Sequence, residues 1–127
     1  MMKIHESAED YLEAMLMLQQ ENGYIRSIDI AQKLNVTKPS VSFAVKQLKE
    51  NGYISMAKDG SIKLLKPGMK IASKIYERHR LLTAFLEKIG VDPITAEKDA
   101  CKMEHDISEE TFNAMCRHAE KGTAEEK

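Results

Sequence analysis

Three residues near the C-terminal end of the chain could together bind a metal ion. Cys101, Glu104 and His105 form a C-x-x-E-H cluster, and on a helix positions i, i+3 and i+4 stack on one face. A thiol, a carboxylate and an imidazole are the usual protein ligands of a divalent transition metal. The spacing therefore predicts that these side chains gather around one cation.

Further candidate ligands lie at Asp10, Glu13 and His79, in segments that also have helical patterns. Each has an ordinary alternative: a lone His is often a core residue, and two acids near a helix start are favoured by the helix dipole. A lone buried Cys is often a small apolar residue. Burying so many ionisable groups at one point without a cation is costly. We therefore predict one metal site whose ligands come from three helices.

The first half of the chain has the pattern of a winged helix-turn-helix. We expect a first helix at about 7–21 with Ser7 as its N-cap, a second capped by Ser27, and a third capped by Thr37 with Pro39 in its first turn. Residues 53–57 and 61–65 alternate apolar and polar residues around Lys58-Asp59-Gly60, which is typical of a hairpin. This hairpin would be the wing.

The second half is predicted to be helical throughout. Pro67-Gly68 begins a long apolar-striped helix at about 67–90, Pro93 begins a fifth helix and Ser108 a sixth. The expected fold is mainly α, with an N-terminal winged helix-turn-helix and two-stranded wing followed by a helical dimerisation domain. We place the DNA-binding domain at residues 1–66 and the metal-binding and dimerisation domain at 67–127.

Charge is distributed unevenly along the chain. Residues 26–80 hold twelve Lys or Arg against four Asp or Glu, a net charge of +8, although the whole chain carries −1. A basic segment over a helix-turn-helix favours double-stranded DNA as the partner. An ordinary solvated surface, or a winged helix that binds another protein, are the alternatives. The candidate DNA-binding residues are Ser27, Thr37, Lys38, Pro39, Ser40, Ser42, Phe43, Lys46 and Lys58. Of these, Phe43 could instead pack against the wing.

Composition predicts a soluble protein. Hydrophobic residues make up 43% and charged residues 31% of 127 residues, and no apolar run approaches the roughly 18 residues of a membrane span. The N-terminus lacks the apolar region of a signal peptide, and two cysteines are too few for a disulfide framework. We expect a cytoplasmic protein without a membrane partner.

These motifs resemble, in the same order, those of the metal-dependent regulators typified by the diphtheria toxin repressor and the manganese transport regulator. The resemblance covers about residues 6–120. The matching segments are Glu9-Asp10-Tyr11-Leu12-Glu13, Pro39-Ser40-Val41-Ser42, Arg78-His79-Arg80-Leu81-Leu82 with Phe85-Leu86, and Cys101 to Ser108. The family likeness implies a homodimeric repressor of metal-uptake genes that binds a palindromic operator when loaded with metal, in the short form without an additional C-terminal domain.

Carried over by position, the resemblance implies the ligand set Asp10, Glu13, His79, Cys101, Glu104 and His105. The set is a hybrid. Its two first-helix acids match the manganese branch, whereas its cysteine matches the iron branch. Two residues that are second-site ligands in the iron branch, Glu and His, are replaced here by Thr83 and Lys98.

The donor types favour Fe(II) slightly over Mn(II), because a thiolate prefers softer ions while carboxylates keep Mn(II) possible. Zn(II), Co(II) or Ni(II) are expected to substitute. A regulator gated by cysteine oxidation or a small ligand is the main alternative. A metallohydrolase is disfavoured, because the candidate ligands can saturate the ion and no further acid, base or oxyanion donor accompanies them.

Overall fold

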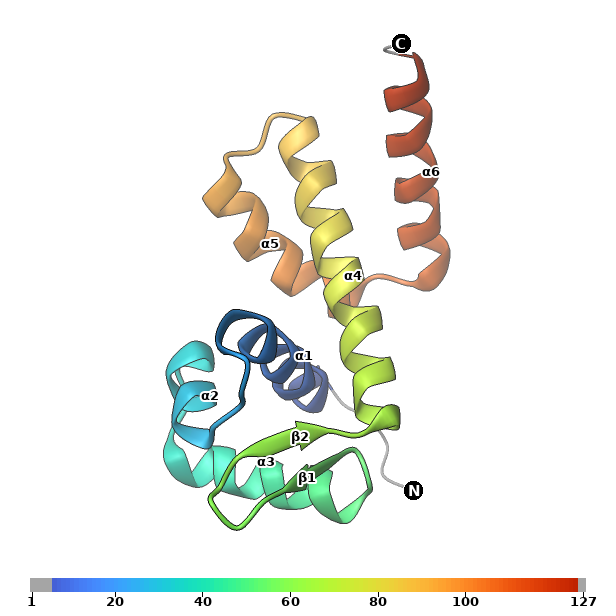
Figure 1. Ribbon diagram of the computed structural model, residues 1–127. Helices are drawn as coiled ribbons and strands as arrows, with labels where there is room; N and C mark the ends of the chain where they lie inside the picture. Colours follow the sequence, from blue (N-terminus) through green and yellow to red (C-terminus); the bar gives the residue numbers. More distant parts are fainter. Residues whose placement is uncertain (1–5, 126–127) are drawn as a thin grey trace. The chain divides into compact units, whose positions relative to one another are not determined.

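The computed structural model describes residues 6–125, with side chains from 7 to 119, and divides the chain into two compact units, Met1–Tyr76 and Glu77–Lys127. It is mainly helical with one two-stranded sheet, as expected (Figure 1). The elements are α1 (Glu6–Asn22), α2 (Ser27–Leu34), α3 (Lys38–Glu50), β1 (Ile54–Met56), β2 (Ile62–Leu64), α4 (Lys66–Lys88), α5 (Pro93–Asp106) and α6 (Glu109–Glu125). Within the described range, no helix has the length and apolar character needed to traverse a lipid bilayer.

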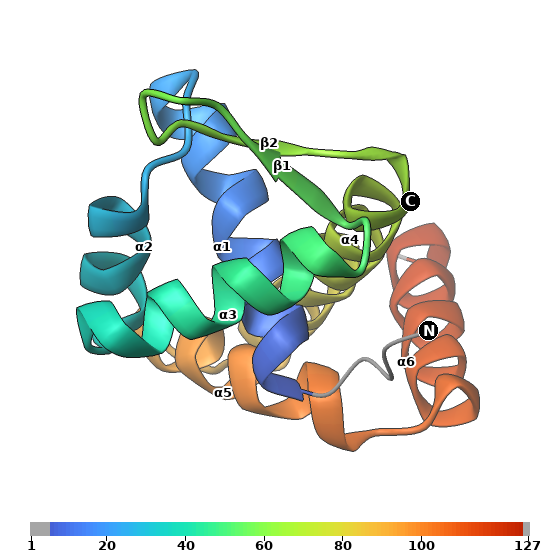
Figure 2. The same cartoon turned by 90° about the horizontal axis from the view of Figure 1, so that it is seen from below.

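The core of the first unit is formed by the apolar faces of its first three helices. Leu12 and Met15 of α1, Ile30 of α2, and Val41 and Leu48 of α3 are at most 1% exposed. Leu12 and Met15 are three residues apart, and Val41 and Leu48 are seven apart, which keeps each pair on one helix face. Figure 2 shows α3 following α2 after a short turn. The three helices therefore form one packed helix-turn-helix body.

The wing is a short antiparallel hairpin. Ile54 pairs with Leu64 and Met56 with Ile62, and an isolated bridge joins Ile25 to Ile62. All except the half-buried Met56 are buried. The hairpin is thereby fixed on the helical body by both its backbone pairing and its apolar face.

The turn of the wing spans Ala57 to Ser61. The Ala57 N–H donates to the Ser61 carbonyl at 2.9 Å, and Gly60 has a φ of +88°, which a glycine adopts readily. The Ser61 hydroxyl and N–H donate to Asp59 Oδ1 at 2.7 and 2.9 Å. These bonds, with a smaller effect of the Arg26 charge, lower the pKa of the Asp59 carboxyl.

The helix caps confirm one of the first-half predictions and correct two. Thr37 Oγ1 accepts a hydrogen bond from the Ser40 N–H, so Thr37 caps α3 as predicted. Ser27 was wrongly predicted to be a cap: it is the first residue of α2, whose N-cap is Arg26 with no side-chain cap bond. Ser7 lies inside α1, which begins at Glu6. α1 includes Glu6, the residue before its candidate cap, whereas α2 begins at Ser27 itself, so that Ser27 follows the N-cap position by one residue.

The first turn of α4 packs tightly against Tyr53, which lies between α3 and β1. A methyl group placed on the buried Gly68 would overlap the Tyr53 carbonyl oxygen. The same carbonyl accepts a hydrogen bond from the Leu65 N–H at 3.0 Å. Only glycine allows this close approach of backbone to helix.

The second unit contains the C-terminal half of α4 with α5 and α6. Leu82 of α4, Ala100 of α5 and Phe112 of α6 are the buried centre of its core. Asp92 caps α5 by accepting from the Ile94 and Thr95 N–H groups. The unit is a three-helix arrangement in which α5 and α6 both contact α4.

Candidate metal centre and nucleic-acid interface

The ligand-bearing helix α5 has one buried face that ends in a carboxylate. Ala96, Ala100 and Glu104 lie at i, i+4 and i+8, and all three are at most 1% exposed. The two small alanines allow α5 to approach its neighbours closely, while the third position carries an ionisable group. The same face that forms the core thus presents Glu104 to the protein interior.

Glu104 lies between two histidines. His79 Nδ1, from α4, is 3.1 Å from Glu104 Oε2, and His105 Nε2 is 3.4 Å from Glu104 Oε1. Ligand atoms of His79, Cys101 and Glu104 all lie within 4.8 Å of one another. Four of the six predicted ligands, all in the second unit, are therefore brought together around the Glu104 carboxylate.

The donor set fits a divalent transition metal. Glu104 is 1% exposed, and within the described region its Oε1 makes no hydrogen bond. A buried carboxylate oxygen in this condition is costly unless a cation balances its charge. Donor atoms bound to one ion at about 2.0–2.3 Å lie roughly 3.0–3.4 Å apart along the edges of the coordination polyhedron. The His79–Glu104 separation is of this size.

The remaining two candidate ligands lie in the first unit. Asp10 and Glu13 are three residues apart on α1, and the Glu13 side chain is buried at 4% exposure while Asp10 is half-buried. A spacing of three places both carboxylates on one side of the helix. A glutamate side chain is rarely this buried unless it is paired.

The third helix presents a polar face to solvent. Val41, Val45 and Leu48 are buried, and the candidate DNA-binding residues of this helix are exposed. These are Lys38, Pro39, Ser40, Ser42, Phe43 and Lys46. Thr37 is also exposed, but its hydroxyl is engaged with Ser40 Oγ at 2.8 Å and with the cap bond. Lys58 is exposed at the tip of the wing, and Ser27 is half-buried at the start of α2.

Phe43 was expected either to touch a thymine methyl group or to pack against the wing. It is 65% exposed and lines a groove of about 560 Å³ formed by residues of α1 and α3. Tyr11 and Ala44 line the same groove. Burial raises the pKa of the Tyr11 hydroxyl, which keeps it neutral there. Phe43 is therefore accessible on the outer side of α3.

One residue of the basic segment is not available to phosphate. Arg78 contributes to the +8 charge, but its side chain is only 12% exposed and donates to the Ile107 carbonyl inside the second unit. Counting charges along the sequence cannot distinguish a solvated arginine from a buried one. The one feature of the sequence that could have indicated a different role for Arg78 is its position directly before the candidate ligand His79.

Comparison with known proteins defines the class of protein to which this chain belongs. Residues 3–62 match the family model described as "Iron dependent repressor, N-terminal DNA binding domain", and residues 66–124 match "Iron dependent repressor, metal binding and dimerisation domain". Together the two models cover nearly the whole chain. The protein is a metal-dependent, DNA-binding transcriptional regulator and not an enzyme.

The chain belongs to the iron dependent repressor family. It is 38% identical over 110 residues to the transcriptional regulator MntR of Escherichia coli O6:H1, a match that covers 87% of this chain and 71% of that protein. It superposes on T. acidophilum IdeR with a TM-score of 0.80 and 25% identity, and on the manganese regulator SloR with 0.77 and 28%. These matches cover 93% and 94% of this chain but only 55% of either solved chain, so it spans about half their length.

Proposed function

We propose that this protein represses metal-uptake genes in the cytoplasm, and that it binds a palindromic operator as a homodimer when Fe(II) or Mn(II) is bound. The observation that carries the proposal is the buried Glu104 carboxylate with His79, Cys101 and His105 around it. These donors occur in a chain whose N-terminal part matches a DNA-binding domain. Metal-dependent repression requires both a metal site and a DNA-binding domain.

The proposed ligand set is Asp10, Glu13, His79, Cys101, Glu104 and His105. Four of these are supported by their proximity in the second unit. The two acids of α1 are supported by the burial of Glu13, by their spacing and by the family resemblance. We divide the chain functionally at residues 66 and 67, so that α4 belongs to the metal-binding and dimerisation domain.

The DNA-reading residues are proposed from their exposure at the start of α3 and on the wing. Ser40, Ser42 and Phe43 would contact base edges in the major groove, with the Phe43 ring suited to a thymine methyl group. Lys38, Lys46 and Lys58 would neutralise phosphates. Thr37 and Pro39 would fix the start of α3, and the hydroxyls of Ser27 and Thr37 would contact the phosphate backbone.

The dimer is proposed to form through apolar residues of the second unit. Leu81, Ile89 and Ile94 are 42%, 61% and 67% exposed. Large apolar side chains exposed on a small three-helix unit indicate a surface that a second copy covers. Pairing two DNA-binding domains in this way suits a two-fold operator whose half-sites are about 34 Å apart or a multiple of that distance.

A bound cation would balance the charge of the buried Glu104 carboxylate and of the thiolate of Cys101, which is exposed, beside the imidazoles of His79 and His105. The ligands of α4 and α5 lie in the second unit, while Asp10 and Glu13 lie on the helix that packs against the DNA-reading helices. If all six residues bind together, occupancy and operator affinity are thermodynamically linked. A coupling of about 1–3 kcal/mol is typical for such regulators.

The identity of the native metal is proposed from donor softness. Cys101 favours Fe(II) over Mn(II), whereas the three carboxylates retain affinity for Mn(II). Zn(II), Co(II) and Ni(II) would also bind these donors and can serve as substitutes in the laboratory.

The decisive experiment is an operator-binding titration of metal-stripped protein under anaerobic conditions, with Fe(II), Mn(II) and Zn(II) added in turn. A promoter region of a metal-uptake gene serves as the probe, and an unrelated duplex of equal length as the control. We expect about 5- to 150-fold tighter binding with Fe(II) or Mn(II), which corresponds to the coupling of about 1–3 kcal/mol, and reversal by a chelator. Equal affinity with and without metal would contradict the proposal.

A further inference from the structure

A single arginine connects all three helices of the second unit at the level of the metal ligands. Arg78 of α4 directs its Nη2 to the Ile107 carbonyl at 3.1 Å, and its Nη1 lies 3.8 Å from Glu109 Oε2. Its guanidinium carbon is 4.9 Å from the centre of the Phe112 ring. One planar group therefore contacts the end of α5 and the first turns of α6.

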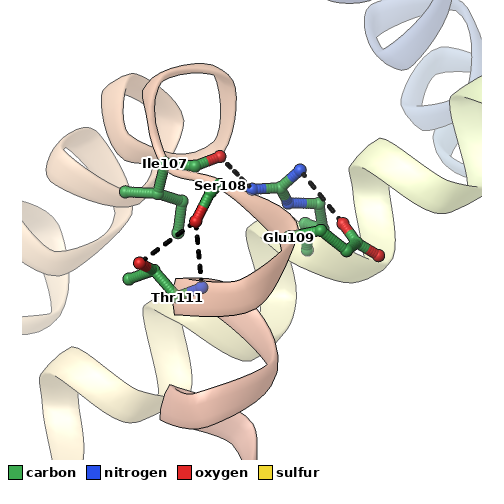
Figure 3. Close-up of polar contacts among 5 residues, drawn as sticks. Ile107, Ser108, Glu109 and Thr111 are labelled. Atoms are coloured by element: carbon green, nitrogen blue, oxygen red, sulfur yellow. Dashed lines mark hydrogen bonds and ion pairs between the residues drawn. The ribbon is translucent and has the colours of Figure 1, made fainter.

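The contacted carbonyl belongs to the residue that ends α5. Ile107 is the C-cap of that helix, three residues after Glu104 and two after His105. Figure 3 shows Ile107 and Ser108 at this junction, with the Ser108 hydroxyl capping α6 through the Thr111 N–H at 3.1 Å. The ligand-bearing turn of α5 and the first turn of α6 thus meet at Arg78.

The position of Arg78 beside His79 makes the connection direct. His79 approaches Glu104 from α4, and the preceding residue holds the same turn of α5 by its backbone. A helix end fixed by a hydrogen bond to its last carbonyls cannot shift or unwind without breaking that bond. The His79–Glu104 contact at 3.1 Å and the Arg78–Ile107 hydrogen bond at 3.1 Å therefore join the same turns of α4 and α5.

Simple stability does not explain the choice of arginine here. The side chain is 12% exposed, and its Nε–H has no hydrogen-bond acceptor in the described part of the chain. An apolar residue of similar length would avoid this buried, unsatisfied donor. Only a planar fork can donate to a carbonyl, approach a carboxylate and cover an aromatic ring simultaneously.

We propose that Arg78 is a positioning residue of the metal centre, which holds the last turn of α5 against α4 so that Glu104 and His105 stay within reach of His79. Through Glu109 and Phe112 it also links that turn to α6. The inference rests on the proposed metal centre. Residues that orient metal ligands in this way typically contribute 10- to 100-fold to metal affinity.

The test uses the full-length, metal-stripped chain titrated anaerobically with Co(II). The visible bands of Co(II) report coordination geometry, and a near-ultraviolet thiolate band reports whether Cys101 is bound. Arg78→Met keeps the unbranched stem and removes the fork, and Arg117→Met on exposed α6 sequence is the matched control. We expect Arg78→Met to bind Co(II) 10- to 100-fold more weakly with altered bands, and Arg117→Met to match the wild type.

Arg78→Lys separates geometry from charge and also provides a variant expected to fold if Arg78→Met does not. A lysine can donate to the Ile107 carbonyl but cannot also cover Phe112 as a plane, so we expect partial recovery, still severalfold weaker than wild type. A second readout needs no metal. Backbone amides of residues 104–108 should exchange with deuterium faster in both Arg78 variants than in Arg117→Met.

The outcomes distinguish this inference from the function on which it rests. If wild-type protein binds no Co(II), the metal centre itself is overturned. If the wild type binds but either Arg78 variant matches it in affinity and bands, with unchanged exchange at 104–108, only the role of Arg78 is overturned.

Discussion

Replacing Glu104 by glutamine should have opposite effects on the metal-bound and metal-free protein. The substitution keeps the size of the side chain and removes its charge. In the metal-free protein, Glu104 is 1% exposed with one oxygen outside any hydrogen bond. Removing that buried charge should leave stability unchanged or raise it by about 1 kcal/mol.

With metal present, Glu104→Gln should instead make the protein less stable than the wild type. A cation at 100 times its dissociation constant stabilises the wild type by about 2.7 kcal/mol. Losing one charged ligand should weaken binding at least 100-fold, leaving roughly 0.4 kcal/mol at the same concentration. At about 4 °C per kcal/mol, Co(II) should raise the wild-type Tm by about 10 °C and that of Glu104→Gln by about 2 °C.

Thermal unfolding with and without Co(II), combined with a direct titration, measures both effects. Glu97→Gln is the matched control, because Glu97 is an exposed glutamate on the same helix. If Glu104 were merely a structural residue, Glu104→Gln would lower the Tm equally in both states. That result, or a wild-type response of Glu104→Gln to Co(II), would refute the reasoning.

Three further predictions concern other parts of the chain. Cys101→Glu should shift selectivity toward Mn(II), because a hard oxygen replaces a soft thiolate; unchanged relative Mn(II) and Fe(II) affinities in titrations would count against this. Gly68→Ala should destabilise the first unit by about 1–3 kcal/mol in urea unfolding, because the methyl group overlaps the Tyr53 carbonyl; wild-type stability would show that the backbone gives way easily. The lowered pKa of Asp59 means that its contribution to the wing is present above the unfolded pKa and lost as pH falls through the folded one. The Ser61 amide resonance should therefore shift in acid in the wild type but not in Asp59→Asn, and a pH-independent Ser61 resonance in the wild type would contradict this.

Much of the fold could be predicted because its local signals agree with one another. In the third helix, the Thr37 hydroxyl, a proline in the first turn and a stripe of valine and leucine all indicate the same boundaries and the same buried face. The wing was predictable for a similar reason, since alternation and the Asp59-Gly60 pair agree. The predicted caps at Ser7, which has Asp10 three residues later, and at Ser27 were both wrong, because a serine near an expected helix start does not by itself fix the boundary.

The candidate site was predictable only within one helix. Spacing alone places Cys101, Glu104 and His105 on one face, whereas the approach of His79 from α4 depends on tertiary packing that no periodicity contains. The anchoring by Arg78 was hidden for the same reason. Its partners are a backbone carbonyl and a ring located 29 and 34 residues later, and a carbonyl has no signature in a sequence.

The 25-residue separation between His79 and Glu104 has a consequence for the metal-free chain. A metal ion bound by these two proposed ligands would act as a removable cross-link between α4 and α5. On the chain-entropy description used for cross-links, closing a loop of this size is worth about 3–4 kcal/mol. If His79 and Glu104 bind the metal as proposed, we expect the metal-free chain to have a less stable α4–α5 hairpin, with faster local opening and faster proteolysis of this segment than in the metal-bound protein.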